Sequence, residues 1–307
     1  MVQIYMAALY SNRFLEGTNF WERLNEREQY ICTHLPHVLE SYHYIHQQVY
    51  VDAIRAAQQP VFLDSGAFSA HTLGVQIKVE DYCDYIHRNR DIIRVEDGNL
   101  MASVLDGIGD PLQTYRNQLE MEARGVRPLP CFHFGEDERY LEWYVRNYDY
   151  ITIGGMVGKS VPQLMTWLDR VWNKHMVDGS GNPRLKVHAF GITSIPIMEA
   201  YPWYSCDSSS WIQMSSFGTI LLPDHGAVKV SDKSPSRHDA WQHVSTMPEP
   251  YQEYIHGLMR ERGFDYDRLS TEYLSRRAWN LMVFGEVNAS INAEKGAKYR
   301  THVKELF

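Results

Sequence analysis

Short apolar runs that end at a glycine or an acidic residue recur along this chain, and they constrain its fold more than any other feature. Four of them, residues 62–68, 153–156, 188–191 and 205–208, end in residues suited to chemistry. In a parallel β/α protein such a run ends where a strand reaches the carboxyl edge of its sheet, and active sites are built at that edge. Two of the runs supply a carboxylate and two supply glycine amides. We therefore expect a pocket that holds a flat polar ring beside carboxylates.

Eight candidate strands alternate with helical patterns over the first three quarters of the chain. Asp110 and Ser160 are N-cap residues followed by a proline in the first turn, which predicts helices over 111–124 and 161–175. A third helix is expected over 137–146. The candidate strands are 3–8, 61–64, 103–106, 129–133, 151–154, 187–190, 205–207 and 219–222.

This alternation predicts an α/β fold, a (β/α)8 TIM-like barrel over residues 1–225. Residues 226–307 are expected to be a helical extension packed on the barrel, with helices over 248–262, 266–281 and 293–306. Residues 10–60 are long for one crossover, so an extra helix is expected there. A doubly wound sheet is the alternative, but its phosphate-binding glycine turn is absent from the sequence.

The composition is typical of a soluble globular protein, with 44% hydrophobic and 22% charged residues among 307. No apolar run approaches the roughly 18 residues that span a bilayer, and the first residues contain no basic cluster of a signal peptide. The chain is therefore not expected to enter a membrane. Four widely spaced cysteines without a CxxC pair indicate a reduced, cytoplasmic protein.

The net charge is −8, and the negative excess lies in the expected barrel. Residues 1–225 hold 18 Lys and Arg against 27 Asp and Glu, whereas residues 226–307 hold 12 against 11. A general nucleic-acid coat is excluded by this balance, but a local basic surface on the extension is compatible with it. The alternative is a set of solvated helix faces. The basic residues concerned are Arg260, Arg262, Arg268, Arg276, Arg277, Lys295, Lys298 and Arg300.

Asp64 and Asp207 end two of the candidate strands, and Asp106 ends a third. Carboxylates on either side of an anomeric carbon are the usual apparatus for breaking a glycosidic bond, one as nucleophile and the other as proton shuttle. Neighbouring serines favour an ionised Asp207 through hydrogen bonding. The alternative is that each aspartate caps the helix that follows it.

Gly154 and Gly155 offer backbone amides that can approach the carbonyl oxygen of a ligand closely. Met156, Phe68 and Phe190 are candidates to lie against a ring face; a tight turn and core packing are the alternatives. Metal binding is not expected. The 14 histidines include no HExxH motif, and no cysteine lies near the pairs His43–His46 and His238–His243.

Taken in order, these segments resemble the tRNA-guanine transglycosylase superfamily, and most of all the short DNA-guanine transglycosylases of bacteriophages and bacteria. Residues 63–68, which include Asp64 and Ser65, are similar to the family's T-D-S-G-G-[FY] segment. Residues 105–106 lie where the family has an aspartate that reads guanine. Residues 154–156 are similar to its G-G-L turn, 190–191 to its base-stacking position, and 206–207 to the segment with the nucleophile.

The resemblance implies a pentosyltransferase that exchanges guanine in DNA for a free 7-deazaguanine. Asp207 would attack the anomeric carbon of a flipped guanine nucleotide, and Asp64 would remove the N9 proton of the incoming base. Asp106 would accept from N1–H and the 2-amino group, the Gly154 and Gly155 amides would donate to the 6-oxo group, and His133 would assist them. No cofactor is implied.

The sequence departs from the tRNA enzymes in ways that favour DNA as the polymer. No cysteine follows Cys206, so the family's zinc site is absent, and no RNA-binding domain is appended. The same chemistry on tRNA remains one alternative, and a barrel hydrolase that uses the two carboxylates on a nucleoside or sugar is another. A barrel that only binds nucleic acid is the third. The sequence leaves open the particular 7-deazaguanine, the strandedness and sequence context of the DNA, and the oligomeric state.

Overall fold

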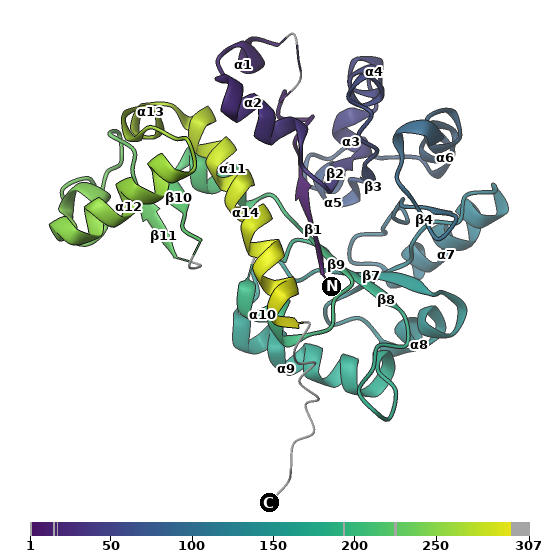
Figure 1. Ribbon diagram of the computed structural model, residues 1–307. Coiled ribbons are helices and arrows are strands. Elements are labelled where there is room, and N and C mark those ends of the chain that lie inside the picture. Colours follow the sequence, from purple (N-terminus) through teal and green to yellow (C-terminus); the bar gives the residue numbers. More distant parts are fainter. Residues whose placement is uncertain (1, 15, 17, 193, 224–225, 296–307) are drawn as a thin grey trace, which may run out of the picture. The chain divides into compact units, whose positions relative to one another are not determined.

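The computed structural model describes residues 2–14, 16, 18–192, 194–223 and 226–295 (Figure 1). The chain divides into two compact units. The first contains the residues up to Asn12, His37–Ser208 and the described residues from Ile291 on, and the second contains Arg13–Pro36 and Ser209–Ser290. The second unit combines a segment of the expected first crossover with residues from Ser209 on. The domain boundary expected after residue 225 stays a prediction.

The first unit is built on a seven-stranded sheet in the order β3-β2-β1-β9-β8-β7-β6, in which every adjacent pair is parallel. Parallel neighbours need long crossovers, and helices supply them here. Because Ser41 is in register with Asp64, and His133 with Gly154, several carboxyl ends reach the same edge. The strands are β1 (Gln3–Ala7), β2 (Val38–Ser41), β3 (Phe62–Asp64), β6 (Cys131–His133), β7 (Tyr150–Gly154), β8 (Lys186–Ala189) and β9 (Ser205–Ser208).

Residues 101–104 form backbone hydrogen bonds to both ends of this sheet order. On the β3 side, Leu63 donates to the carbonyl of Met101 at 2.8 Å and accepts from Ser103 at 2.9 Å. On the β6 side, Val104 donates to Leu129 at 3.0 Å, and Leu129 donates back to residue 102 at 2.8 Å. The predicted strand 103–106 is thus reduced to two parallel bridges, at Ala102 and Ser103, which begin one residue earlier than predicted. The sheet is curled and barrel-like.

Two sequence-based strand assignments need correction. The predicted eighth strand, residues 219–222, is instead β10 (Thr219–Leu221), which pairs antiparallel with β11 (Ala227–Lys229) in the second unit. Strand β2 was not predicted. Val38, Leu39 and Glu40 are all buried, but the charged residue ends the apolar run after two positions, so the stretch lacks the longer run that marked the other strands.

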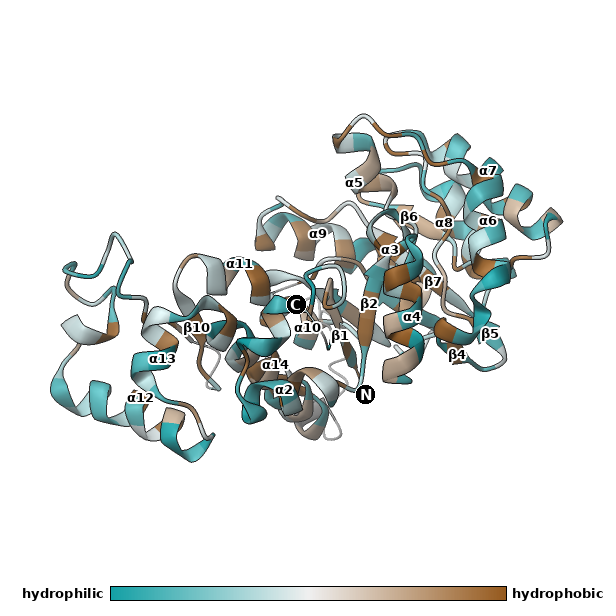
Figure 2. Cartoon of the chain, turned by 90° about the horizontal axis from the view of Figure 1, so that it is seen from above, coloured by the Kyte–Doolittle hydropathy of each residue, from teal (hydrophilic) through white to brown (hydrophobic). Residues whose placement is uncertain are grey.

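Helices surround the strands of the first unit (Figure 1). Their ends follow the predicted signals: the Asp110 side chain caps α7, Ser160 and Gln163 form a capping box on α9, and Gly125 has a φ of 79° after α7. Figure 2 colours much of β1 and β2 hydrophobic, whereas α6 and α7 are largely hydrophilic. The helices are α3 (Tyr42–Ile45), α4 (Gln48–Ala57), α5 (Ala67–Thr72), α6 (Val79–Arg88), α7 (Pro111–Ala123), α8 (Glu138–Asn147), α9 (Val161–Val171) and α10 (Ile195–Ala200).

Side chains from different strands fill the inside of the curled sheet. A buried cluster is formed by Tyr5, Ala7, Leu39, Phe62, Met101 and Leu129. Tyr150 and Phe190 pack against it from partly buried positions. The interior is therefore a packed core, and the chemistry must lie at the strand ends.

The second unit is mainly helical. The predicted helix 248–262 is confirmed as α12 (Glu249–Glu261), and 266–281 is split after Thr271 into α13 (Tyr266–Thr271) and α14 (Tyr273–Lys295). Of the predicted helix 293–306, only its first three residues are described, and they belong to α14. The remaining elements are α1 (Asn19–Glu22), α2 (Glu26–Thr33), α11 (Ser210–Ser216), β10 and β11.

Several basic residues of the surface considered for the C-terminal extension are paired with carboxylates or buried within the second unit. Arg268 pairs with the fully buried Glu28 at 2.6 Å, and Arg262 pairs with Glu286 at 3.0 Å. Arg276 and Arg277 are buried, at 5% and 9% exposure. Arg260 is exposed, whereas Lys298 and Arg300 and the side chain of Lys295 lie outside the described residues. No helix in the described part of the chain has the length and apolarity to cross a bilayer.

Candidate active site

Three aspartates lie at the carboxyl edge of the first unit's sheet. Asp64 ends β3, Asp207 lies in β9, and Asp106 follows the hydrogen-bonded residues 101–104. Across the described residues, no lysine or arginine forms an ion pair with any of them. The charges of Asp106 and Asp207 both act on Asp64, so the three groups form one electrostatic site.

Asp64 is held by the turn that follows it. Its two oxygens accept from the backbone N–H of Gly66 at 2.9 Å and from the hydroxyl of Ser103 at 3.3 Å. Burial and the neighbouring carboxylates nonetheless raise the pKa of Asp64 from 3.8 to about 7. Gly66 has a φ of 74°, and a Cβ there would lie 2.3 Å from Ser41 Oγ. Only glycine fits this turn.

Asp207 lies in a different environment from Asp64. It is 7% exposed, and its Oδ1 accepts from the backbone N–H of Gly191 at 2.8 Å and from His188 Nε2 at 3.3 Å. These two donors fix the orientation of the carboxylate through Oδ1, and the described residues provide no hydrogen bond to Oδ2.

A chain of hydrogen bonds supports Asp207 from behind. His188 is fully buried, and burial lowers its pKa despite the nearby carboxylate, so the ring is neutral. Since Nε2–H faces Asp207, Nδ1 must accept, and it accepts from Ser205 Oγ at 2.6 Å. Ser205 Oγ in turn accepts from the Tyr150 hydroxyl at 2.7 Å. All three hydrogen bonds are therefore donated in the same direction, from Tyr150 to Ser205, from Ser205 to His188 and from His188 to Asp207.

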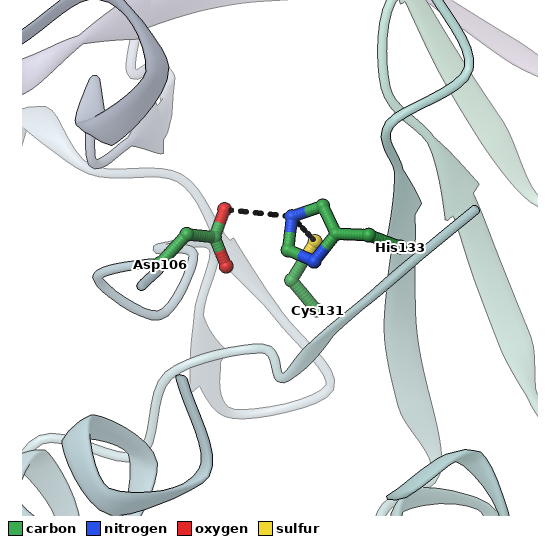
Figure 3. A group of neighbouring side chains, drawn as sticks. All are labelled: Asp106, Cys131 and His133. Atoms are coloured by element: carbon green, nitrogen blue, oxygen red, sulfur yellow. Dashed lines mark hydrogen bonds and ion pairs between the residues drawn. The ribbon is translucent and has the colours of Figure 1, made fainter. Parts of the chain in front are cut away.

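Asp106 faces His133 across the edge (Figure 3). Its Oδ2 lies 3.3 Å from His133 Nε2, while its Oδ1 is buried without a hydrogen-bond partner. On the other side of the ring, His133 Nδ1 lies 2.9 Å from Glu136 Oε1, and Glu136 Oε2 accepts from the His133 backbone at 3.0 Å. A buried acceptor without a donor is costly, so Asp106 Oδ1 is positioned for a ligand.

The Gly154–Gly155 turn lies beside His133. A Cβ on Gly154 would come within 3.0 Å of the His133 ring, and Gly155 has a φ of 71°. A Cβ on Gly155 would lie 3.1 Å from the backbone nitrogen of Phe134. Both glycines are therefore required for the close approach of this turn to the histidine.

The other predicted site residues occupy varied surroundings. Phe68 is 68% exposed at the start of α5, whereas Phe190 packs edge-on against His188 with ring centroids 4.7 Å apart. Ser65 is fully buried, and its hydroxyl accepts from the backbone of the same turn, so it shapes the turn. Met156 is 2% exposed.

Two hollows open near the strand ends. One, of about 630 Å³, lies between α5 and α7 at the carboxyl edge and is lined by Asp106, His71 and Asn117 among others. The second, of about 430 Å³, lies at the amino ends and is lined by Glu96 and Lys186 among others. Only the first contains one of the three aspartates.

The sequence prediction missed three residues of the site: His188, Cys131 and Glu136. Ser205 was expected as a hydrogen-bond partner of Asp207, but its hydroxyl bonds to His188 and Tyr150 instead. Period-two alternation carries a signal for two of the missed residues, because His188 precedes Phe190 by two residues and Cys131 precedes His133 by two, so each shares a sheet face with a predicted residue. Glu136 follows β6 in a turn, and no periodic pattern identifies it.

No protein-family model matches the chain, and no curated protein sequence matches it significantly.

Proposed function

We propose that this chain is a glycosyltransferase that exchanges guanine in DNA for a free 7-deazaguanine base through a covalent aspartyl intermediate. The supporting observation is the meeting of Asp64, Asp106 and Asp207 at one edge, in three different environments. Two carboxylates in different surroundings, one of them with a raised pKa, suit a nucleophile and a proton shuttle. The fold that we propose with this function is a (β/α)8 barrel whose eighth strand is residues 101–104.

Asp207 is the proposed nucleophile. Hydrogen bonds from Gly191 and His188 hold Oδ1, which leaves Oδ2 to attack the anomeric carbon of a flipped guanine nucleotide. Guanine leaves and a nucleotidyl ester forms. The incoming base then displaces Asp207 from the same carbon, and the two inversions retain the configuration.

Asp64 is the proposed proton shuttle. A group with a pKa near the working pH both accepts and donates a proton readily, and the pKa of Asp64 is about 7. In the second half-reaction its carboxylate takes the N9 proton of the 7-deazaguanine, and that nitrogen attacks the anomeric carbon. In the first half-reaction protonated Asp64 gives its proton to N9 of the departing guanine and becomes the carboxylate that the second half-reaction uses.

Recognition of the base is assigned to Asp106, His133 and the glycine turn. The unpartnered Oδ1 of Asp106 accepts from N1–H and the 2-amino group of guanine, a pattern that adenine does not offer. Gly154 and Gly155 donate to the 6-oxo group, assisted by His133. Phe68, exposed beside the edge, stacks on a base or sugar.

The test is a base-exchange assay. The protein is incubated with labelled guanine or 7-cyano-7-deazaguanine and with DNA or tRNA, and each polymer is digested to nucleosides for mass spectrometry. We expect label in DNA, and its loss in Asp207→Ala. The matched control is Asp84→Ala, which removes an exposed aspartate from α6.

The outcomes separate the competing functions. Label in tRNA alone would assign the protein to the tRNA branch of the same chemistry. Free guanine released without incorporation, with water as acceptor, would indicate an N-glycoside hydrolase. The absence of both, with several 7-deazaguanines, would overturn the proposal. Nucleic-acid binding that survives Asp207→Ala would then favour a purely binding role.

A further inference from the structure

Cys131 joins Asp106 and His133 in a three-residue cluster with chemistry of its own. The three side chains come from the neighbouring segments 101–106 and β6, and Figure 3 shows them converging on one point. One donor atom from each, an oxygen, a sulfur and a nitrogen, lies within 4.8 Å of the other two. Cys131 is fully buried, while Asp106 and His133 have side-chain exposures of 12% and 18%. The cluster is thus buried on the side of Cys131 and partly exposed on the side of Asp106 and His133.

The two distances from His133 Nε2 to the other donor atoms match the edges of a tetrahedron around zinc. Zinc–ligand bonds of about 2.0 Å to oxygen or nitrogen and 2.3 Å to sulfur place N and O ligands about 3.3 Å apart, and N and S ligands about 3.5 Å apart. His133 Nε2 lies 3.3 Å from Asp106 Oδ2 and 3.5 Å from Cys131 Sγ. Both observed separations agree with that geometry.

A proton alone satisfies this cluster poorly. His133 Nε2 holds at most one hydrogen, and that hydrogen points along one direction, yet both Asp106 and Cys131 face this atom. A cation placed between the three donors satisfies all of them at once. Thiolate, imidazole and carboxylate together form a donor set that zinc prefers, whereas magnesium and calcium take oxygen ligands.

The outer contacts of His133 are those of a metal-bound histidine. Glu136 Oε1 lies 2.9 Å from Nδ1, and its other oxygen accepts from the His133 backbone at 3.0 Å, so the carboxylate is held twice. A carboxylate on the far nitrogen fixes the tautomer of a metal-bound histidine and directs Nε2 at the metal. This contact is an observation independent of the convergence of the three donors.

We propose that Asp106, Cys131 and His133 bind a zinc ion, with Glu136 as the outer carboxylate and a fourth coordination position open towards the hollow beside Asp106. Three protein ligands and one open position are typical of zinc sites that bind a further ligand. This inference goes beyond the proposed function and does not depend on it. Zinc on Asp106 Oδ2 leaves Oδ1 available to a base. The two proposals share Asp106 and His133, and zinc on His133 Nε2 would remove only the assistance of this ring to the 6-oxo group, so the proposals can fail separately.

The experiment measures metal binding by the full chain, without any use of base exchange. Chelator-treated protein is titrated with Zn²⁺ against a competing chelator, and with Co²⁺ while its absorption spectrum is followed. We expect one ion per chain, tetrahedral d–d bands, and a sulfur-to-cobalt charge-transfer band. Glu136→Gln should weaken zinc binding about 10- to 100-fold, and Cys131→Ala should weaken it further and abolish the charge-transfer band.

Cys83→Ala is the matched control, because it removes another buried cysteine, from α6. It should retain wild-type affinity and the charge-transfer band. X-ray absorption of the zinc-loaded wild type, which requires no variant to fold, should show one sulfur among the zinc ligands. A zinc shell without sulfur, binding of less than one ion per chain at saturation, or unchanged affinity in Cys131→Ala would each overturn the proposal.

Discussion

Charged side chains are paired differently at the two ends of the first unit's strands. At the amino ends, Lys186 pairs with Glu96 at 2.9 Å and with Asp97 at 2.6 Å, and the hydroxyl of Tyr204 donates to Glu96. The ammonium group of Lys186 also lies 4.1 Å from the centre of the Tyr204 ring. Each of these charges has an opposite partner, so this end contributes to stability.

At the carboxyl ends, no lysine or arginine among the described residues pairs with Asp64, Asp106 or Asp207, and the only ionisable side chains paired with them are histidines. Burial and the neighbouring carboxylates raise the pKa of Asp64 to about 7, and one oxygen of Asp106 has no hydrogen-bond partner. Such an arrangement reduces stability, and proteins retain it where a ligand, a metal or a proton completes it. The difference supports the placement of the proposed site at the carboxyl ends, with the amino ends contributing to stability.

The sharpest test of this contrast is Asp207→Asn. The variant keeps the shape of the side chain but lacks a nucleophilic carboxylate, so base exchange should fall at least about 1,000-fold. The midpoint of thermal unfolding should stay the same or rise, because one of three repelling charges has been removed. Exchange rates and melting curves measured on the same preparation check both parts. A large loss of stability would break the contrast.

Asp64→Asn should change the pH dependence of stability. Because the pKa of Asp64 rises from 3.8 to about 7 on folding, the folded wild type holds a proton between these values that the unfolded chain releases. Its stabilising effect is complete below about pH 4 and is lost as the pH rises through 7. The asparagine in the variant has no such proton, so the variant's free energy of unfolding should not fall in this way. Relative to wild type, it should rise by on the order of 1–3 kcal/mol between pH 5 and pH 8.

Urea unfolding at both pH values measures this difference. Glu40, whose pKa burial raises to about 7, is present in both proteins, so its effect cancels in the comparison. Parallel stability profiles for the two proteins would show that Asp64 ionises normally and would remove its assignment as proton shuttle.

His188→Asn sharpens the contrast within the carboxyl end. His188 acts through Asp207, so the variant should lower kcat about 10- to 100-fold with little change in KM. Steady-state kinetics of base exchange measure this split. Ser205→Ala, which breaks the same chain one step further back, should have a smaller effect in the same direction. An increase in KM alone would indicate that His188 only shapes the pocket.

Lys186→Met tests the amino end. Removing the shared cation leaves Glu96 and Asp97 without this partner, and we expect a loss of about 1–2 kcal/mol of unfolding free energy. Exchange activity below the melting temperature should be unchanged. Denaturant unfolding measures the loss, and the double variant Lys186→Met/Glu96→Gln should recover part of it. Lost activity with intact stability would reverse the roles of the two ends.

Phe68→Ala should have the smallest effect on stability. The side chain is 68% exposed, so its removal should change the unfolding free energy by less than about 0.5 kcal/mol. If Phe68 stacks on the substrate, the KM for DNA should rise several-fold with kcat retained. An unchanged KM would place Phe68 outside the substrate path.

The sequence by itself determined the features that depend on near neighbours. Short apolar runs located six of the seven sheet strands, and cap residues such as Asp110 located the helix starts. The same runs identified Asp64, Asp106 and Asp207, because a side chain at the end of a parallel strand lies at the carboxyl edge wherever the strand is placed. Local order of this kind needs information from only a few residues on either side.

Only the tertiary structure decided which distant residues meet. Glu28 and Arg268 pair within the second unit although 240 positions separate them, and residues 219–221 form a hairpin strand instead of joining the sheet. The convergence of Asp106 with Cys131 and His133 likewise depends on the bridge between Ser103 and Leu129. Such contacts follow from the burial of whole elements against one another, and no local pattern records the partner that each element buries.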